Sequence, residues 1–560
     1  MSTQAKHITR RTFLRLAGLT VGSAALAACA PAPAAQPAAP AAPAAAATQA
    51  PAATAAPIAT PVPAATAAPA AAGAGKTITV AQYADAVSLD PQDTNDNASY
   101  GPEKLMFEGL VGFNEKMEMQ AMLAEKWTAT PDAMTFTFSL RKNVKFHDGT
   151  PFNAAAVKYN FDRMTNPDNK LKRYGLYSVI AKTEAVDDYT VKFTMAKPFG
   201  AMLATFAHPA GGIVSPAAAK QGADAPAFGK KPVGTGPYKF TEWIPSDHLT
   251  VERFADYWNP AQGAKVDKFI IKPVVEAGTR LNMLQAGDAQ FINTVPYAQA
   301  KLLAGNKDVS VAENEAIYTY WVAMNTTKEP FKDKRVRQAL NYAIDKQAII
   351  DAVLGGYGKL IDSPLAPRVW GYKGVKTYNY DVAKAKALLK EAGVTGVKTT
   401  LWASENTESK AVAVAIQGQL KEVGVEVEIV TMEAATLTAE RFKKAEENKS
   451  MMNYAGWSPS TGDADWGLRP LLAKESIPPA SFNLAFWDNA DFNAQIAAGL
   501  ATSDEEKRKA AYAKAQEIAI EEAPWIFLWM TKVLGGISNK CGGMVIQPDG
   551  IAYLRTGYYK

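Results

Sequence analysis

The segment VKTTLWASENTESKAVAVAIQGQLKEVGVEVEIVTM, residues 397–432, decides the fold class. Its two ends, VKTTLWAS and VEVEIVTM, are rich in β-branched and apolar residues and are typical of strands, whereas residues from about 407 to 423 are typical of a helix. A strand, a helix and a strand in this order predict two parallel strands joined by a right-handed crossover. We therefore expect an α/β lobe after about residue 326.

The chain before this point favours antiparallel pairing. Residues 183–195, TEAVDDYTVKFTM, are two alternating runs around an Asp-Asp turn, and residues 238–254 contain a second such pair around Pro245-Ser246-Asp247. KTITVAQY (76–83) and MTFTFSL (134–140) also alternate as strands do. The overall class predicted is α/β with mixed sheets.

Two helices have recognisable ends. FNAAAVKYNFDRM (152–164) predicts a helix capped by Asn153. DKRVRQALNYAIDKQAIIDAVLGG (333–356) predicts one long amphipathic helix that starts at Asp333 and is closed by Gly355 and Gly356.

The first 75 residues have a different composition. Residues 1–29 have a basic start, a short apolar stretch and small residues before Cys29, which is the form of an export signal that ends in a lipobox, with Cys29 as the lipidated residue. An ordinary secretory signal with an incidental cysteine is the alternative, and the Arg10-Arg11 pair favours twin-arginine export but also occurs in general secretory signals. Residues 30–75 carry no charge and consist mostly of Ala, Pro and Thr, so we expect a disordered tether.

Charge and cysteine content argue against a nucleic-acid-binding protein and against a protein held together by internal disulfides. Four of the 60 basic residues precede Lys76, which leaves 56 against 55 acidic residues and a net charge of about +1, so the composition predicts no nucleic-acid partner. If Cys29 is lipidated, Cys541 is the other cysteine of the chain and no intramolecular disulfide can form.

The sequence also lacks the residue patterns of an enzyme. His147, His208 and His248 stand in no metal-binding spacing, and the chain contains neither a G-x-S-x-G elbow nor a phosphate-binding loop. Asp463 and Asp465 could be an acid/base pair, but their spacing in a loop does not establish one. VGTGPY, residues 233–238, leads into a strand and is interpreted as structural. We therefore predict no catalysis, no metal site and no cofactor.

Several stretches together resemble the extracytoplasmic solute-binding proteins of ABC importers, family 5, which includes dipeptide, oligopeptide, nickel and glutathione binders. The resemblance covers residues 76–560, and within the family it is nearest the glutathione and dipeptide branch. It rests on four blocks in the family's order, FSLRKNVKFHDGTPFNAAAVKYNFDR (138–163), PVGTGPYKF (232–240), EPFKDKRVRQALNYAID (329–345) and AGWSPSTGDADWGLRPLLAKESIPPASFNLAFW (455–487).

This resemblance implies a two-lobed, hinged periplasmic-binding-protein fold. Residues 76–325 would form lobe I with an extra subdomain near 100–228, residues 326–530 would form lobe II, and residues 531–560 would return to lobe I. Lobes of this kind close on a solute by a hinge movement.

The resemblance also implies a binding site. Gly456 and Trp457 match a segment that lines the interlobe cleft, and Asp463 matches an aspartate that takes the α-ammonium of a dipeptide. Asp463 is equally typical of a turn or a helix cap, and Trp457 of a core residue. Arg368 and Arg469 lie in loop-like sequence and are candidates for gripping a carboxylate, although most arginines are exposed or paired within the fold.

The function implied is therefore a receptor outside the cytoplasm, held to the membrane by its lipid anchor only. It would deliver a short peptide or peptide-like solute to an ABC permease, and it would act as a monomer. A receptor for nickel or a metal chelate is the alternative within the family, and a cell-surface peptidase is the alternative from another class. A third alternative is a surface sensor or scaffold that uses the same fold.

Overall fold

The computed structural model describes residues 76–221, 228–303, 305–376 and 378–560. The predicted export signal with Cys29 and the predicted tether, residues 30–75, lie outside the described residues. Within the described part, no helix is both long enough and apolar enough to cross a bilayer.

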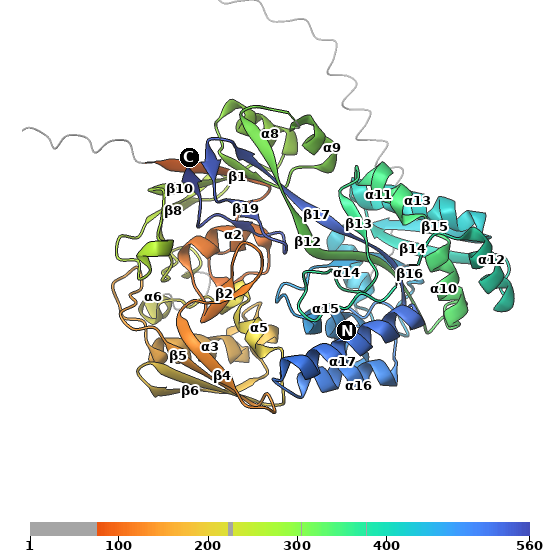
Figure 1. Cartoon of the computed structure of the whole chain (residues 1–560), viewed down its shortest axis with the longest axis horizontal. Coiled ribbons are helices and arrows are strands. Elements are labelled where there is room, and N and C mark those ends of the chain that lie inside the picture. The colour runs from red at the N-terminus through yellow and green to blue at the C-terminus, as the bar shows by residue number, and fades with distance from the viewer. Residues whose placement is uncertain (1–75, 222–227, 304, 377) are drawn as a thin grey trace, which may run out of the picture. The chain divides into compact units, whose positions relative to one another are not determined.

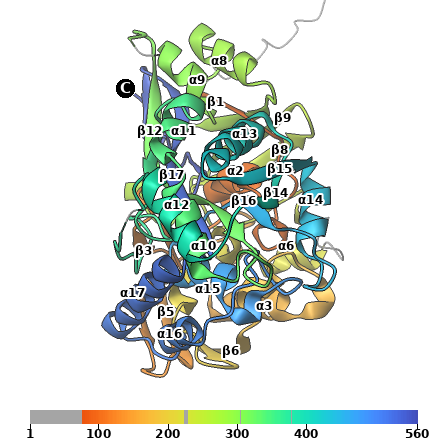
Figure 2. The same ribbon diagram turned by 90° about the vertical axis from the view of Figure 1, so that its right-hand side faces the viewer.

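Two long antiparallel strands occupy the middle of the largest sheet. β12 (Val309–Met324) and β17 (Trp525–Ser538) pair along most of their length, with register shifts between Glu315 and Thr319 and between Tyr320 and Trp321. In the described chain this 11-stranded sheet has the order β15-β14-β16-β12-β17-β11-β1-β10-β9-β8, and β13 pairs with β17 off this path. Figures 1 and 2 show β12 and β17 side by side, so these strands join the two ends of the sheet.

The other strands of this sheet are short. They are β1 (Thr77–Gln82), β8 (Tyr238–Ile244), β9 (His248–Arg253), β10 (Lys268–Pro273), β11 (Phe291–Asn293), β13 (Gly358–Leu360), β14 (Val397–Ser404), β15 (Val425–Met432) and β16 (Met452–Trp457). The smaller sheets contain β2 (Val111–Phe113), β3 (Met119–Ala121), β4 (Ala124–Ala129), β5 (Thr135–Leu140), β6 (Ile180–Asp187), β7 (Thr190–Met195), β18 (Cys541–Gly542), β19 (Val545–Ile546), β20 (Ala552–Tyr553) and β21 (Tyr558–Tyr559).

The helices lie around these sheets. They are α2 (Asn97–Met106), α3 (Ala154–Thr165), α4 (Tyr174–Tyr177), α5 (Met202–Phe206), α6 (Pro216–Gln221), α8 (Ala277–Ala286), α9 (Tyr297–Ala300), α10 (Lys334–Tyr342), α11 (Lys346–Val353), α12 (Val382–Glu391), α13 (Thr407–Glu422), α14 (Ala434–Arg441), α15 (Ala464–Leu472), α16 (Ala490–Leu500) and α17 (Glu505–Glu522).

The parallel unit predicted from residues 397–432 is confirmed. β14 and β15 pair in parallel from Val397–Val425 to Ser404–Met432, and α13 connects them. The antiparallel predictions are also confirmed, since β6 pairs with β7 and β8 with β9. The predicted cap is present too, because the Asn153 side chain accepts a hydrogen bond from the Ala156 amide at the start of α3.

The prediction of one long helix over 333–356 is wrong. The structure contains two helices, α10 and α11, and Asp345 caps the second by accepting a hydrogen bond from the Ala348 amide. The Lys346 ammonium donates to the Asn341 and Tyr378 carbonyls at the break. An amphipathic pattern continues across such a break, because both helices turn their apolar face to the same core.

The VGTGPY segment has the structural role expected of it. A Cβ at Gly234 would lie 2.2 Å from the Met106 carbonyl oxygen, and one at Gly236 would lie 2.5 Å from the Leu105 carbonyl oxygen. Glycine is therefore required here for close approach of two backbone segments.

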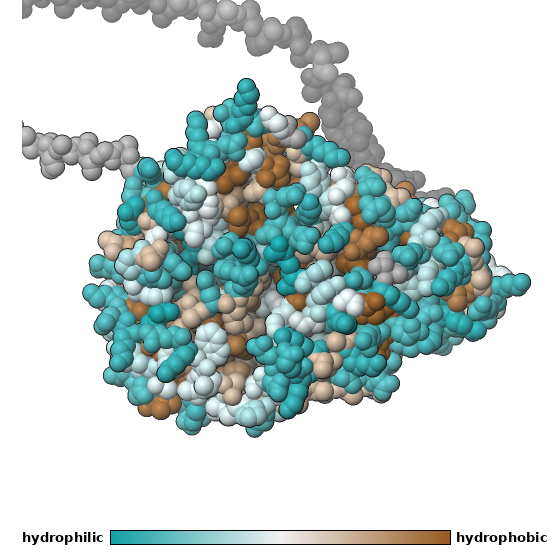
Figure 3. All heavy atoms as spheres, viewed as in Figure 1, coloured by the Kyte–Doolittle hydropathy of each residue, from teal (hydrophilic) through white to brown (hydrophobic). Residues whose placement is uncertain are grey.

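The face drawn in Figure 3 is mostly hydrophilic, with small separate hydrophobic areas. One such area lies over α8 and α9, and the nearby Val275 and Leu302 are exposed by 80% and 71%.

Candidate functional site

A cavity of about 1000 Å³ lies against β12 and β17. This volume is at the upper end of the range usual for small-molecule sites. Its lining comes from both ends of the large sheet and from the C-terminal segment; it includes Tyr83, Asn95, Asn97, Thr294, Tyr297, Tyr318, Tyr320, Glu408, Ser458, Ser460, Lys532, Asp549 and Ile551. We call this space the large chamber.

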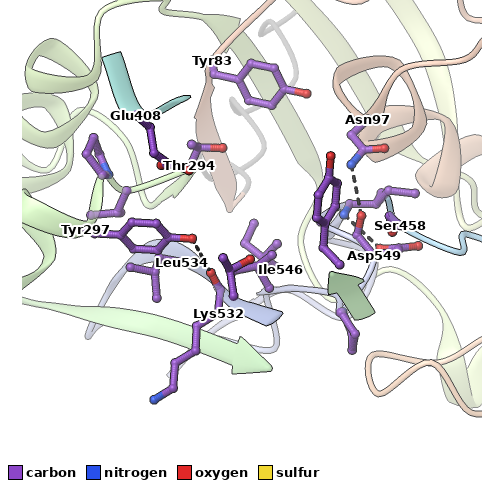
Figure 4. Close-up of a pocket in the computed structure, with 18 of the residues that line it drawn as sticks. Tyr83, Asn97, Thr294, Tyr297, Glu408, Ser458, Lys532, Leu534, Ile546 and Asp549 are labelled. Atoms are coloured by element: carbon purple, nitrogen blue, oxygen red, sulfur yellow. Dashed lines mark hydrogen bonds between the residues drawn. The ribbon is translucent and has the colours of Figure 1, made fainter. Parts of the chain in front are cut away.

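Polar groups gather on two sides of the large chamber. In Figure 4, Glu408, Thr294 and Tyr297 lie on one side, and Asn97, Ser458 and Asp549 lie on the other. The Tyr297 hydroxyl donates to the Lys532 carbonyl at 3.1 Å, and the Asn97 amide donates to the Asp549 carbonyl at 3.2 Å. These contacts anchor the lining to β17 and to the C-terminal segment.

Two buried oxygens of this lining lack a hydrogen-bond partner. They are the Ser458 hydroxyl and Asp549 Oδ2, whose nearest cation is the Lys104 ammonium at 3.9 Å. Burial raises the pKa of Asp549, an effect that Lys104 opposes. Buried polar groups in native proteins are nearly always paired, so unpaired ones beside a cavity indicate where a ligand contributes donors or acceptors.

A second cavity of about 560 Å³ shares Tyr318, Tyr320 and Glu408 with the first. We call it the side chamber. Aromatic rings form much of its wall: Tyr320 stacks on Tyr454 with centroids 5.8 Å apart, and Trp457 packs on Phe482 at 5.0 Å. Besides Glu408, its polar lining residues include Arg441, Asn406, Ser404 and Ser409.

Gly456 and Trp457, two of the predicted site residues, line the side chamber. Gly456 faces Tyr320 across the β12–β16 pair, and a Cβ there would lie 2.4 Å from Tyr318 Cε1 and 2.8 Å from Tyr320 Cδ1. The Trp457 indole donates to the Trp466 carbonyl at 2.8 Å. The lack of a side chain at Gly456 therefore leaves room for the rings of Tyr318 and Tyr320. The hydrogen bond to Trp466 fixes the orientation of the Trp457 indole.

Asp463 lies outside the lining of both chambers. It is the cap of α15, accepting from the Asp465 amide, and both of its oxygens are 2.9 Å from Arg508 Nη2. The side chains of this ion pair are only 3% and 7% exposed. Burial raises the pKa of Asp463, and the Arg508 guanidinium opposes that rise. The expected role of Asp463 in holding a solute ammonium stays a prediction.

The two predicted arginines are also outside the chamber linings. Arg469 forms a two-point ion pair with Asp465, with both contacts at 2.8 Å, and Arg368 is exposed. Of the four residues Asp463, Asp465, Arg368 and Arg469, the structure brings none into either lining. The assignment of Asp463, Arg368 and Arg469 as solute contacts stays a prediction.

The histidines have local partners. His147 accepts from the Gly234 amide and lies 3.0 Å from the Gly236 carbonyl, while His248 pairs with Asp247 and Glu242. His208 is 2% exposed and lines the large chamber. Nowhere in the described ranges do three or more His, Cys, Asp or Glu side chains form a group that could hold a metal ion.

Sequence reasoning missed the main charged residues of the chambers. Glu408 was part of the predicted helix, and Arg441 and Asp549 belonged to no motif. Asn95 and Asn97, which lie just before and at the start of α2, also line the large chamber. No local signal distinguishes Glu408 from an ordinary residue in the first turn of a helix, because acidic residues are common there.

Comparisons with known proteins agree with this geometry. Residues 118–478 match the family model described as bacterial extracellular solute-binding proteins, family 5, middle part. The chain is 42% identical to the glutathione-binding protein GsiB of Salmonella typhimurium over 481 residues, which cover 85% of this chain and 93% of that protein.

Solved structures show the same fold. HbpA2 from Haemophilus parasuis superimposes with a TM-score of 0.78 at 28% identity, covering 86% of this chain and all of that chain. The periplasmic binding protein DppA from Helicobacter pylori, in complex with the peptide STSA, gives a TM-score of 0.72 at 29% identity, covering 87% and 98%.

The fold is thus that of the two-lobed periplasmic binding proteins, as predicted, and the relatives are solute-binding proteins of transport systems, not enzymes. The chain belongs to the bacterial extracellular solute-binding proteins, family 5.

Proposed function

We propose that this protein is a lipid-anchored receptor that binds a short peptide or peptide-like solute in the large chamber and delivers it to an ABC import permease. Glutathione is the first candidate, because the relative at 42% identity is named as a glutathione-binding protein. The observation that carries the proposal is a chamber of about 1000 Å³ whose lining includes both acidic and basic side chains together with unpaired buried oxygens. Such a lining suits a solute that has both an ammonium and a carboxylate.

We propose that two lobes of the protein close around the solute when it binds. We assign residues 76–325 and 531–560 to lobe I and residues 326–530 to lobe II. β12 and β17 would carry the hinge, since they are the strands that link the two ends of the sheet. Solute contacts made from both sides would stabilise the closed form.

The proposed location is the outer face of the membrane. Cys29 would carry the lipid, and residues 30–75 would hold the folded part at a distance from the bilayer. The functional unit would be a monomer.

Calorimetric titration of the full chain, purified in mild detergent, tests the proposal. Glutathione, Ala-Ala and tri-alanine are titrated separately, and native mass spectrometry checks whether a solute travels with the protein. Saturable binding of a peptide with a Kd of about 10 μM or lower would support the proposal. If only nickel with a small chelator bound, the chelate receptor would be the better assignment, and release of amino acids from a peptide would show a peptidase.

A further inference from the structure

Arg441, at the end of α14, is held in the wall of the side chamber without an anionic partner. Its Nε donates to Asn453 Oδ1 at 3.2 Å, and its Nη2 donates to the Tyr454 carbonyl at 2.6 Å. No carboxylate of the described residues lies within ion-pair distance of it. Two neutral acceptors therefore orient the guanidinium but leave its charge uncompensated.

The surroundings make that charge costly. The side chamber is walled by Tyr318, Tyr320, Trp457 and Phe482, and burial lowers the pKa of Arg441 to about 10. Tyr454, a residue only 5% exposed, also lines the side chamber, and its hydroxyl makes no hydrogen bond within the fold. A carboxylate in the side chamber could accept from the guanidinium.

A group of opposite charge lies at the junction of the two chambers. Glu408 lines both, and it forms no ion pair with any described residue. Burial raises the pKa of its carboxyl. Arg441 and Glu408 do not neutralise each other, although they line the same cavity. One unpaired cation and one unpaired anion together match a ligand that has both charges.

We propose that the side chamber is the specificity pocket for the solute, with Arg441 binding a carboxylate and Glu408 binding an ammonium. This inference rests on the proposed function and narrows the solute to a zwitterion with a carboxylate that reaches past the junction. A peptide lacking that carboxylate would occupy the large chamber alone and bind more weakly.

The test compares acid and amide forms of one peptide. Calorimetry on the full chain measures glutathione and its glycine amide, which differ in one carboxylate, and tri-alanine and its amide serve as a second pair. We expect the unmodified chain to bind at least one acid about tenfold or more tightly than its amide. In Arg441→Gln this preference should disappear because the acid loses affinity, and Arg441→Lys should recover part of it.

Two further variants separate binding from folding. Arg253→Gln is the matched control, because Arg253 is exposed, pairs with Asp267 at the surface and lines neither chamber; it should keep the acid preference. Tyr454→Phe is a second control in the wall of the side chamber, because the hydroxyl that it removes makes no hydrogen bond in the fold; it should keep both the melting temperature and the acid preference.

The outcomes distinguish the two proposals. Peptide binding with an unchanged acid preference in Arg441→Gln overturns the side-chamber inference and leaves the proposed function standing. A chain that binds none of the peptides overturns the proposed function and, with it, this inference.

Discussion

At the scale of single residues, Asp463 has the clearest structural role. Its carboxylate caps α15 and pairs with Arg508 in a nearly dry contact, and the Arg508 guanidinium also lies 4.4 Å from the Trp370 ring centre. Removing one partner of a buried pair leaves an uncompensated charge.

We therefore expect Asp463→Asn to lower the free energy of unfolding by ~3 kcal/mol in urea denaturation. Asp381→Asn is the control, because Asp381 caps α12 in the same way but is exposed, and it should change stability by less than ~0.5 kcal/mol. Peptide affinity of Asp463→Asn, measured below its melting temperature, tests the assignment to a solute ammonium: a loss of about tenfold or more supports it, and unchanged affinity contradicts it.

His147 makes stability depend on pH. Burial lowers its pKa to about 4 from 6.5, although its contact with the Gly236 carbonyl opposes this. Between pH 6.5 and pH 4, His147 is therefore protonated in the unfolded chain but neutral in the folded chain. The contribution of neutral His147 to the unfolding free energy is complete above pH 6.5 and is lost as the pH falls toward 4.

His147→Gln should keep both contacts and remove the titration. Between pH 7 and pH 4 we expect the unmodified chain to lose ~2 kcal/mol more unfolding free energy than the variant. Chemical denaturation at several pH values measures this difference, and parallel curves for the two chains would show that His147 does not titrate as described.

At the scale of elements, strand β16 depends on the absence of a side chain at Gly456. In Gly456→Ala the added methyl group would collide with Tyr318 and Tyr320, so the strand or the rings must shift. We expect a loss of ~1–3 kcal/mol in unfolding free energy and weaker peptide binding, measured by denaturation and calorimetry.

Gly418→Ala is the control for this element. Gly418 is exposed within α13, and a Cβ there would have no atom within 4 Å. Alanine should stabilise that helix by ~0.5–1 kcal/mol. If Gly456→Ala changed the unfolding free energy by the same amount as Gly418→Ala, Tyr318 and Tyr320 would be able to move aside without loss of stability.

At the scale of the whole molecule, the proposed mechanism requires a change of shape on binding. Small-angle X-ray scattering of the full chain should show a smaller radius of gyration at saturating peptide than without it. At the same peptide concentration, Gly456→Ala should show a smaller decrease in the radius of gyration, because a smaller fraction of a weaker binder is in the closed form. An unchanged radius at measured saturation would contradict lobe closure.

The anchor is a second property of the whole molecule. Cys29→Ser should move the protein from the membrane fraction to the released fraction, since a lipidated cysteine is the expected attachment. Cys541→Ser is the control, because Cys541 is buried and should not affect attachment. Membrane association of the Cys29→Ser chain after a high-salt wash would contradict the lipid anchor.

Local patterns sufficed for much of the fold. The crossover unit at 397–432, the hairpins and the Asn153 cap depend on neighbouring residues, and each was predicted. The break between α10 and α11 at Asp345 was not predicted, because an apolar pattern indicates which face of a helix is buried but not whether one helix continues or two follow each other. For the site, the order of family blocks led to Gly456 and Trp457 but not to Arg441, Glu408 or Asp549.

The sequence by itself determined the α/β class, the family and the lack of enzyme motifs, because these depend on periodicity, composition and the order of motifs. Only the tertiary structure decided that Asp463 pairs with Arg508, that β12 pairs with β17, and that Glu408 and Arg441 line one chamber. Those relations join residues far apart in the chain, and whether a charge is paired within the fold or left for a ligand depends on which distant segments pack around it.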